Sequence, residues 1–438
     1  MPIIDSRLTV GIWAEWPAGA RWANEGMVRL LGFLIEGAAA NRKILFRVVL
    51  PDSIRQDADA DLATLKATIG LDYSLHSPSD RPAAPGDHAA SPDHDAEMRE
   101  LVQFANDRVA VDGWLVLFPH FEYARFLTGH KAVIFPDAIP RVFPLFRRGN
   151  WNEGGASQIW FEKVKKVLAA ADRFVTFSHH VADSQLVGLF QCEPDLIDIV
   201  PHAPPLLDGI FPLGAEGKTS ASKAAAARLL REHAEARGWD YLRDFPFEEV
   251  RYIAVSTQDR QTKNIPLAAE AVRILTREHF IDLKILMTAP IHYGHDWTPL
   301  PDFIEKNRME MDIVSMPDLP RDVHAAFYHC ATITIHPSFF EGGQAPFPFY
   351  ESVSVGTPCL FARGPHTEEL TAPVPALGAY MFDPYEAGEL ARSIARILEH
   401  SDDAIRDQRS TLGILASHRT WADVALDYAR SAVPSFTS

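Results

Sequence analysis

Two glutamates separated by a glycine-containing loop are the residues of this chain best suited, by type and spacing, to do chemistry. They lie in the stretch HPSFFEGGQAPFPFYESVSVGTP, with Glu341 in the loop and Glu351 ten positions later. Residues 331–338 (ATITIHPS) are typical of a buried strand. A helix is expected to begin near Pro348, carry Glu351 in its first turn, and end at the Gly-Thr-Pro of residues 356–358.

The loop between this strand and this helix has the features of an anion-binding turn. In a parallel α/β sheet such a loop lies at the carboxyl edge, where a helix N-terminus offers free N–H groups. These groups and the helix dipole favour an anion such as a diphosphate. Gly342 and Gly343 let the backbone approach a ligand without a Cβ in the way. A simple turn and a dipole-stabilising glutamate are the structural alternatives, but the combination favours a ligand site.

Taken together, these residues resemble the signature of family-4 retaining glycosyltransferases, which have the GT-B fold. The chain departs from the signature by placing nine residues between the two glutamates, more than the family usually has. The extra residues lie in GGQAPF, the loop that holds the donor sugar in relatives, so the identity of the sugar stays open. The matching positions are Pro337, Ser338, Glu341, Gly342, Pro348, Glu351, Gly356, Thr357 and Pro358.

Other stretches extend the resemblance over nearly the whole chain. MFDPYEAGELARSIARIL resembles the family's run after the last strands, and VSTQDRQTKNIPLAAEAV resembles the element that supplies a phosphate-binding basic pair. Lys263 occupies the lysine position of that pair. Gln258 stands where an arginine is usual, so Arg260 is expected to take over its charge, with a solvated turn as the alternative. In the first half the resemblance is weaker, and Pro136 replaces an expected histidine.

The resemblance implies a metal-independent transfer with no cofactor, in which a nucleoside-diphosphate sugar is the substrate. Arg260 and Lys263, with backbone N–H groups near the start of the Glu351 helix, would stabilise the leaving diphosphate. Glu341 would contact the donor sugar and help to stabilise an oxocarbenium-like transition state, and Glu351 would accept hydrogen bonds from the ribose. The remaining donor-binding positions are Gly342, Gly343, Gln344 and Ser352.

Residues on the acceptor side are expected in the first half of the chain. His120, Asp137 and His202 follow predicted strands, and Gly19 lies after the first strand, where relatives have a glycine-rich loop. A structural residue at a strand end is the alternative for each. The resemblance implies a saccharide or lipid-linked acceptor.

One predicted helix has a composition that suits an anionic membrane surface. The run WFEKVKKVLAAA places aromatic and aliphatic residues beside Lys163, Lys165 and Lys166, which would suit weak peripheral contact at the inner membrane face. An ordinary half-buried helix with a solvated lysine face is the preferred alternative, and the net charge of −16 does not favour membrane docking.

These residues must be positioned by strands and helices, and the chain alternates the two throughout. Such alternation predicts a mostly parallel sheet covered on both faces. The pattern runs twice, which predicts an α/β protein of two Rossmann-like domains facing each other across a cleft. Strand-length apolar runs begin at Leu8, Phe46, Trp114, Lys131, Arg173 and Ile197, and again at Arg251, Asp282, Ala331 and Pro358.

Breaks in this alternation give the expected domain boundaries. Residues 1–208 form an N-terminal acceptor-side domain, in which 76–96, rich in Pro, Ala, Ser, Asp and His, are expected to be a mobile insertion. Residues 209–248 are expected to be a linker and helical segment. The resemblance implies that residues 249–415 form the nucleotide-sugar-binding domain, and 416–438 are expected to be a helix that packs back on the N-terminal domain.

The composition excludes several other classes of protein. With 42 basic and 58 acidic side chains, no nucleic-acid partner is expected, because phosphate contacts need a basic face. The three cysteines show no spacing typical of a disulfide framework or a metal site. The chain also lacks GxGxxG after its first strand, GxxxxGK[ST], HExxH and GxSxG. The first residues do not resemble a signal peptide, so a cytoplasmic location is expected.

The sequence therefore predicts a retaining hexosyltransferase of polysaccharide or glycoconjugate biosynthesis. Two alternatives stay open: a GT-B nucleotide-sugar epimerase, which needs no acceptor, and a non-catalytic nucleotide-sugar-binding partner. A pyridoxal-phosphate phosphorylase is disfavoured, because no lysine lies in a setting that suggests a Schiff base.

Overall fold

The computed structural model describes residues 7–17, 26–69, 73–80, 93–143, 156–214, 217–292 and 299–436. The chain folds into two compact units, each built around its own sheet. Unit 1 comprises Met1–Val142, Gly155–Ala203 and Arg419–Ser438, and unit 2 comprises Phe143–Gly154 and Pro204–His418.

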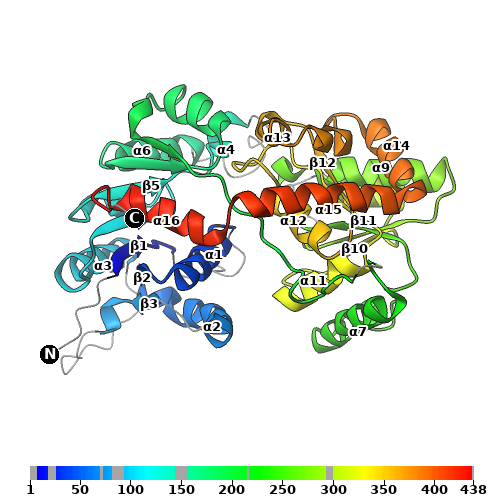
Figure 1. Ribbon diagram of the computed structural model, residues 1–438, viewed down its shortest axis with the longest axis horizontal. Helices are drawn as coiled ribbons and strands as arrows, with labels where there is room; N and C mark the ends of the chain where they lie inside the picture. The colour runs from blue at the N-terminus through cyan, green and yellow to red at the C-terminus, as the bar shows by residue number, and fades with distance from the viewer. Residues whose placement is uncertain are drawn as a thin grey trace. The chain divides into compact units, whose positions relative to one another are not determined.

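Unit 1 contains a seven-stranded sheet of order β3-β2-β1-β4-β5-β6-β7, in which every described pair of neighbouring strands is parallel (Figure 1). Its central strands are continuous apolar runs because both faces of a parallel sheet are covered. All six strands predicted for this half are confirmed. The strands are β1 (Leu8–Trp13), β2 (Ile44–Val49), β3 (Tyr73–His76), β4 (Gly113–Val116), β5 (Lys131–Ile134), β6 (Arg173–Thr176) and β7 (Ile197–Ile199).

Helices connect these strands, and the last helix of the chain belongs to the same unit. The helices are α1 (Gly26–Asn41), α2 (Asp52–Ile69), α3 (His94–Arg108), α4 (Ile139–Val142), α6 (Ala156–Leu168) and α16 (Trp421–Ala432), with shorter helical segments η2 (Pro78–Asp80), η3 (Glu122–Phe126), η5 (Val181–Val187) and η6 (Pro194–Leu196).

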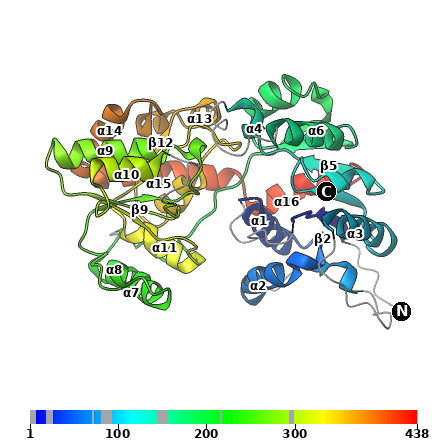
Figure 2. The same cartoon turned by 180° about the vertical axis from the view of Figure 1, so that it is seen from behind.

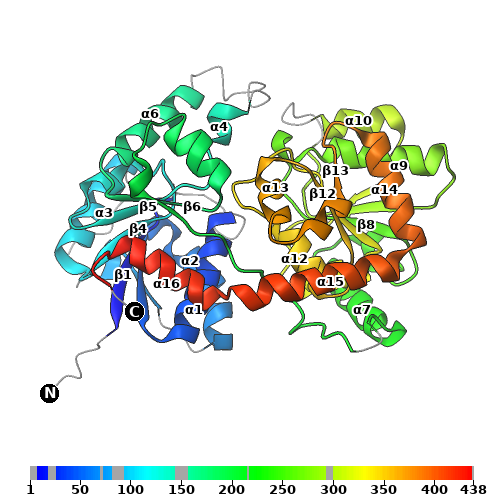
Figure 3. The same cartoon turned by 45° about the horizontal axis from the view of Figure 1, so that its top comes forward.

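Helix α16 packs along α1, beside β4 and β6 (Figure 3). Glycines make this close approach possible. A Cβ at Gly37 would lie 2.0 Å from the Trp421 carbonyl oxygen, and one at Gly113 would lie 2.0 Å from that of Ala432. The Phe33 and Trp421 rings stack with their centroids 4.5 Å apart.

The expected insertion at residues 76–96 is wrong at both of its ends. His76 ends β3, η2 follows directly, and α3 begins at His94 with Asp93 as its N-cap. Residues 93–96 are exposed but belong to the start of this helix, and the buried residues of α3, such as Met98 and Leu101, lie just beyond the segment. Residues 81–92 lie outside the described part of the chain.

Unit 2 contains a six-stranded parallel sheet of order β10-β9-β8-β11-β12-β13. The four strands predicted for this half are confirmed. The strands are β8 (Tyr252–Val255), β9 (Lys284–Met287), β10 (Ile313–Ser315), β11 (Ile333–His336), β12 (Cys359–Ala362) and β13 (Met381–Phe382). The helices are α7 (Ser220–Ala236), α8 (Asp240–Arg243), α9 (Ile265–Arg277), α10 (Leu300–Asn307), α11 (Arg321–Cys330), α12 (Phe347–Ser354), α13 (Pro365–Thr371), α14 (Ala387–Glu399) and α15 (Ser401–His418), with η7 (Gln261–Lys263) and η8 (Pro375–Tyr380).

Alternate residues of the central strand β8 supply the cores on the two faces of this sheet. Ile253 and Val255 pack with α9, α10 and α14, whereas Tyr252 and Ala254 pack with α7 and α11. Figure 2 shows α9 and α10 on one side of the sheet and α11 on the other. The period of two is the signature of a strand buried on both faces.

The segment 209–248, expected to link the domains, is part of unit 2. Its helix α7 packs along α11 and buries Ala226, Leu230 and Ala234 in the core that α11 shares with the sheet. The helix expected in this segment is present, and its buried apolar face makes it part of the unit 2 core.

Candidate active site

The carboxyl ends of β8 and β11 mark the point in unit 2 where the strand order reverses. The chain proceeds outward from β8 to β9 and β10, then returns to β11 on the other side of β8. In open α/β sheets ligands bind at such a point, because the loops after the two central strands diverge there. The loop after β8 leads to Lys263, and the loop after β11 leads to Glu341.

These two loops bring Lys263, Glu341 and His336 together. The ammonium of Lys263 donates to Oε1 of Glu341 at 2.5 Å, and Nε2 of His336 lies 3.1 Å from the same oxygen. The Lys263 and Glu341 side chains are 16% and 23% exposed, so they are partly shielded while remaining open to a ligand. The structure thus brings together two residues that the sequence assigned to catalysis, and adds His336, which sequence reasoning left without a role.

The electrostatics of this cluster keep Glu341 ionised. Burial alone would raise the pKa of Glu341, but the charge of Lys263 and the hydrogen bonds from His336 and Lys263 outweigh burial. The pKa of this carboxyl therefore lies well below its ordinary value of 4.5. The site offers a fixed carboxylate beside an ammonium group, partly shielded from water.

Backbone contacts hold the two loops in register. The Phe339 N–H donates to the Thr262 carbonyl at 2.9 Å, which joins the loop after β11 to the loop after β8. Asn264 takes the left-handed conformation, with φ of 50°, and its side chain donates to the Pro384 carbonyl. Asn tolerates this conformation better than most residues, and it lets α9 begin directly after Lys263. The buried Ser338 hydroxyl has no hydrogen-bond partner among the described residues.

Glu351 is held by a second helix, at a position that differs from the sequence expectation. Helix α12 begins at Phe347, so Glu351 lies in its second turn rather than its first. The side chain is 1% exposed, and the Tyr328 hydroxyl of α11 donates to its Oε2 at 3.2 Å. The Tyr328 ring lies beside that of His324, whose Nε2 is 2.8 Å from the Ser256 hydroxyl after β8. Sequence reasoning missed Ser256, His324 and Tyr328, which adjoin Glu351 only in the folded chain.

The start of α12 is a poorer anion site than the sequence suggested. Pro346 and Pro348 have no N–H groups, and the Phe349 N–H already donates to the Pro346 carbonyl. The expected row of free N–H donors is therefore interrupted by two prolines and by one N–H group that already has a partner. The end of the helix is as predicted, because Gly356 adopts a φ of 88° immediately after it.

Two predicted donor-binding residues, Ser352 and Gln344, and the predicted catalytic residue Arg260 differ in what they offer. Ser352 is completely buried and its hydroxyl donates to the Pro348 carbonyl at 2.7 Å, so it faces its own helix rather than a ligand. The Gln344 side chain donates to Glu369 at 2.9 Å, which leaves its backbone as the predicted contact. Arg260 is exposed and forms no ion pair with any described residue.

The two loop glycines also differ. Gly342 is buried, whereas Gly343 is half-buried and a Cβ there would meet only one atom within 4 Å, the Ala345 carbonyl oxygen at 3.9 Å. Space at Gly343 is therefore available for a ligand or for a side chain.

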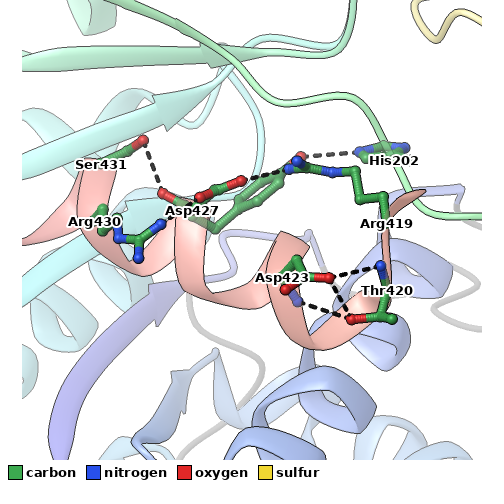
Figure 4. Close-up of polar contacts among 8 residues, drawn as sticks. His202, Arg419, Thr420, Asp423, Asp427, Arg430 and Ser431 are labelled. Atoms are coloured by element: carbon green, nitrogen blue, oxygen red, sulfur yellow. Dashed lines mark hydrogen bonds and ion pairs between the residues drawn. The ribbon is translucent and has the colours of Figure 1, made fainter. Parts of the chain in front are cut away.

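On the predicted acceptor side, His202 is a structural residue of unit 1. Its Nε2 lies 3.0 Å from the Tyr428 hydroxyl, and its ring lies against Phe177 with centroids 4.2 Å apart. Burial, followed by the nearby charge of Arg419, lowers the pKa of His202 to about 3. Figure 4 shows His202 turned toward α16, where Arg419 pairs with Asp427. These contacts match the alternative of a structural residue at a strand end, because the imidazole contacts the C-terminal helix through Tyr428.

Asp137 also has a local structural role. Its Oδ1 accepts from the Ile139 N–H at 3.0 Å, which closes the turn before α4. Asx turns of this kind are a common use of aspartate after a strand. Gly19 lies outside the described residues.

His120 has a different setting, at the carboxyl edge of the first sheet. It follows β4 and contacts the rings of Phe118 and Phe121. Burial, with a smaller contribution from Lys163, lowers the pKa of His120 to about 4, so the imidazole is neutral at pH 7. Glu15, which the sequence analysis missed, follows the adjacent strand β1 and is 7% exposed. Nothing in the local sequence GIWAEWP marks it, because its partner Tyr123 is 108 residues away.

The lysines of α6, the helix considered for weak membrane contact, are largely paired within the unit. Lys166 and Lys163 lie 3.0 Å and 3.8 Å from carboxylate oxygens of Glu122, and Lys165 lies 3.5 Å from Glu162. This pairing favours the ordinary half-buried helix. In the described part of the chain, no helix is long and apolar enough to cross a membrane. Within the same residues, no group of three or more His, Cys, Asp or Glu side chains is arranged to hold a metal ion.

Comparison with known proteins was informative only at the level of structure. No protein-family model and no curated protein sequence matches the chain. Sucrose-phosphate synthase from Thermosynechococcus elongatus superposes with a TM-score of 0.64 at 13% identity, covering 96% of this chain and 97% of that one. HepE of Anabaena in complex with UDP-glucose superposes with a TM-score of 0.60 at 11% identity, and the match covers 97% of this chain and 99% of that one.

A TarM mutant of S. aureus in complex with UDP, Fondaparinux and alpha-GlcNAc-glycerol gives a TM-score of 0.64 at 8% identity, with the same coverage. At these identities the likeness establishes the fold and nothing finer. The chain has the α/β architecture of these proteins, the GT-B fold, as its two parallel sheets also indicate.

Proposed function

We propose that this protein is a glycosyltransferase that moves a hexose-type sugar from a nucleoside-diphosphate sugar to a hydroxyl of a saccharide or glycolipid acceptor. The observation that carries the proposal is the Lys263–Glu341 pair at the switch point of unit 2, the point between β8 and β11 where the strand order of the sheet reverses. A paired carboxylate and ammonium at this edge suit a ligand that has both a hydroxylated ring and phosphates. The same fold holds UDP-glucose in the HepE structure.

Lys263 is assigned to the donor diphosphate. Its ammonium is anchored by Glu341, and Lys263 comes two residues before the first residue of α9, whose dipole favours an anion. As the bond to the sugar breaks, charge builds up on the leaving diphosphate, and a pre-positioned cation stabilises it without reorganisation. Exposed Arg260 adds a weaker, solvent-screened charge.

Glu341 and Glu351 are assigned to the two ends of the donor. Ionised Glu341 accepts hydrogen bonds from sugar hydroxyls and stabilises positive charge that develops on the ring. Glu351, positioned by Tyr328, accepts hydrogen bonds from the ribose. Backbone amides at Gly342, Gly343 and Gln344 contact the sugar, and the space at Gly343 lets a ring approach.

The transfer is proposed to retain the anomeric configuration and to need neither metal nor cofactor. Lys263 and the α9 dipole supply the positive charge that a divalent ion would otherwise supply. The acceptor hydroxyl attacks from the face that the diphosphate leaves, and its proton passes to the leaving phosphate. We place the reaction in polysaccharide or glycoconjugate assembly at the cytoplasmic side of the cell, with at most weak peripheral contact with the inner membrane face.

A donor-only reaction followed by proton NMR tests this proposal. With UDP-glucose and no acceptor, we expect slow release of UDP and glucose, and faster consumption of donor once saccharide acceptors are added. Glu341→Gln should slow donor consumption by about 10²–10³-fold, as loss of a transition-state contact does. Glu270→Gln is the matched control, since Glu270 also pairs with a cation, Arg273, but on the flank of α9.

Each competing function predicts a different outcome of the same NMR experiment. An epimerase converts the donor into a second nucleotide sugar without releasing nucleotide. A binding partner leaves the donor unchanged in wild type and both variants. The first result rejects the transferase, and the second rejects UDP-glucose as its donor.

A further inference from the structure

The loop that carries Glu341 contains two adjacent glycines, so its order depends on contacts with other elements. It runs from the end of β11 at His336 to the start of α12 at Phe347. Gly342 and Gly343 lie in its middle, and glycine loses more conformational freedom on ordering than any other residue. The backbone amides assigned to the donor sugar lie in this part of the loop. Whatever orders the loop therefore also positions those amides.

A hydrogen bond from α13 holds the segment just after the two glycines. The side-chain amide of Gln344 donates to Oε2 of Glu369 at 2.9 Å. Both residues are half-buried, which partly shields the bond from water and strengthens it. Because Gln344 comes directly after Gly343, this bond fixes one end of the segment whose amides are assigned to the sugar.

A ring contact with the same helix holds the other end of this segment. The His366 ring of α13 packs edge-on against the Phe340 ring, with centroids 5.3 Å apart. The two residues are 1% and 8% exposed, so the contact belongs to the interior of unit 2. Phe340 directly precedes Glu341 in the chain. Helix α13 therefore contacts the loop on both sides of Glu341 and the glycines.

Helix α13 is itself fixed to the sheet, so it can serve as a rigid support. It follows β12, the strand beside β11. The Thr367 hydroxyl donates to the Ala362 carbonyl at 3.1 Å and accepts from the Gly364 N–H at 2.9 Å. Near the other end of the helix, Leu370 is buried in the core shared with α12 and β12. These anchors flank Glu369 in the chain and hold it in place beside the donor loop.

We propose that Glu369 is a positioning residue for the transfer, which acts through the Gln344 side chain to hold the loop amides where the donor sugar binds. The inference rests on the proposed function. It concerns the sugar end of the donor and not the nucleotide end, because Lys263 lies on the loop after β8, and Tyr328 of α11 holds Glu351. Loss of the hydrogen bond should therefore impair turnover and leave nucleotide affinity unchanged.

Matched variants separate this hydrogen bond from other effects. Glu369→Ala and Gln344→Ala each remove the bond, and the second keeps the backbone amide of residue 344. Glu369→Gln keeps an acceptor oxygen for the Gln344 side chain, so it should behave as wild type does. Glu368→Ala is the control, because Glu368 is exposed on the same helix and its side chain forms no hydrogen bond or ion pair with any described residue.

Release of UDP from UDP-glucose without acceptor measures the effect on the reaction. Glu369→Ala and Gln344→Ala should each lower kcat about tenfold, as the loss of one hydrogen bond that orients reacting groups does, and change the Kd for UDP by less than about twofold. The double variant should lose no more than either single variant, because two residues that act through one bond are not additive. Additive losses, or a Kd for UDP that rises as much as kcat falls, would overturn the assignment.

Hydrogen exchange tests the same bond without turnover. The Phe339 amide donates to the Thr262 carbonyl, so the peptide that contains it reports opening of the loop. Its exchange should be about threefold to tenfold faster in Glu369→Ala and unchanged in Glu369→Gln and Glu368→Ala. Unchanged exchange in Glu369→Ala, or equal acceleration in Glu368→Ala, rejects Glu369 as the residue that orders the loop.

The two measurements also distinguish this inference from the function on which it rests. If wild type and Glu369→Ala release UDP at the same rate, the positioning role is rejected and the transferase stands. If wild type binds neither UDP nor UDP-glucose, the proposed function fails for this donor. The exchange measurement then still decides whether Glu369 orders the loop.

Discussion

The two units place a glutamate at the same topological position but give it opposite electrostatics. In unit 2, Glu341 lies after β11, one of the central pair β8 and β11, and is compensated by Lys263 and His336, so that its pKa is depressed. In unit 1, Glu15 lies after β1, one of the central pair β1 and β4, and burial raises its pKa to about 7. One switch point therefore holds a permanent charge and the other a titratable group. The fold fixes where a site lies, and the residues around the carboxyl decide what the site can do.

Removing the compensating cation should have the largest effect. Lys263→Met leaves Glu341 with His336 alone, so the pKa of Glu341 should rise and the diphosphate should lose its cation. Turnover of UDP-glucose should fall by about 10²–10³-fold, measured as UDP release. Lys284→Met is the control, because Lys284 donates to the Met311 carbonyl and lies at the start of β9, away from the carboxyl edge. Equal losses in both variants would mean that the effect is not local to the switch point.

Removing the charge of Glu15 should stabilise unit 1, in a pH-dependent way. Between the ordinary pKa of 4.5 and the folded pKa of about 7, the folded state keeps a proton that the unfolded state has lost. Wild type therefore loses stability as pH rises through this window, by about 1.4 kcal/mol per pH unit. Glu15→Gln should exceed wild type by up to about 3 kcal/mol at pH 8.5 and match it near pH 4.5. Urea unfolding at the two pH values measures this, and a constant difference would show that Glu15 is ionised throughout.

The substitution Gly37→Ala tests whether the stability of unit 1 depends on the packing of the C-terminal helix α16. In Gly37→Ala the new methyl group would meet the Trp421 carbonyl, so α16 must move away from α1. Unit 1 should lose about 1–3 kcal/mol of stability, as overpacked cores do. Gly413→Ala, at a helical glycine in unit 2 with open space around it, should instead gain about 0.5–1 kcal/mol. Chemical denaturation of both variants compares the two units directly.

The smallest effect is expected at Arg260, which is exposed and unpaired among the described residues. Arg260→Ala should weaken UDP binding only about twofold to fivefold, and less at high salt, because water screens the charge. A loss as large as that of Lys263→Met would mean that Arg260 turns into the site when the nucleotide binds.

The strands that sequence reasoning missed are all edge strands. β3 and β10 are largely half-exposed, and β13 has only two residues. A strand with a neighbour on one side need not be a continuous apolar run, so its pattern is weak. The buried central strands, by contrast, were all predicted.

The site was predictable where its residues are close in sequence and missed where only folding brings them together. Glu341 and Lys263 were found from the loop pattern and the resemblance. Tyr328 reaches Glu351 from another helix, and Glu15 depends on Tyr123 across 108 residues. Local sequence also misplaced the start of α12 by one residue, because Pro348 occupies the second helical position rather than the first.

The central claim is that the Lys263–Glu341 edge of unit 2 binds a nucleoside diphosphate. The most direct test is to measure the melting temperatures of wild type and Lys263→Met with UDP, GDP, ADP, dTDP and CDP, first without metal and then with magnesium. A ligand that binds the folded state alone raises the melting temperature. We predict that one nucleotide stabilises wild type without metal and that Lys263→Met binds it at least about tenfold more weakly, the cost of one charged hydrogen bond. Stabilisation by none of the five, or equal stabilisation of both proteins, would contradict the account.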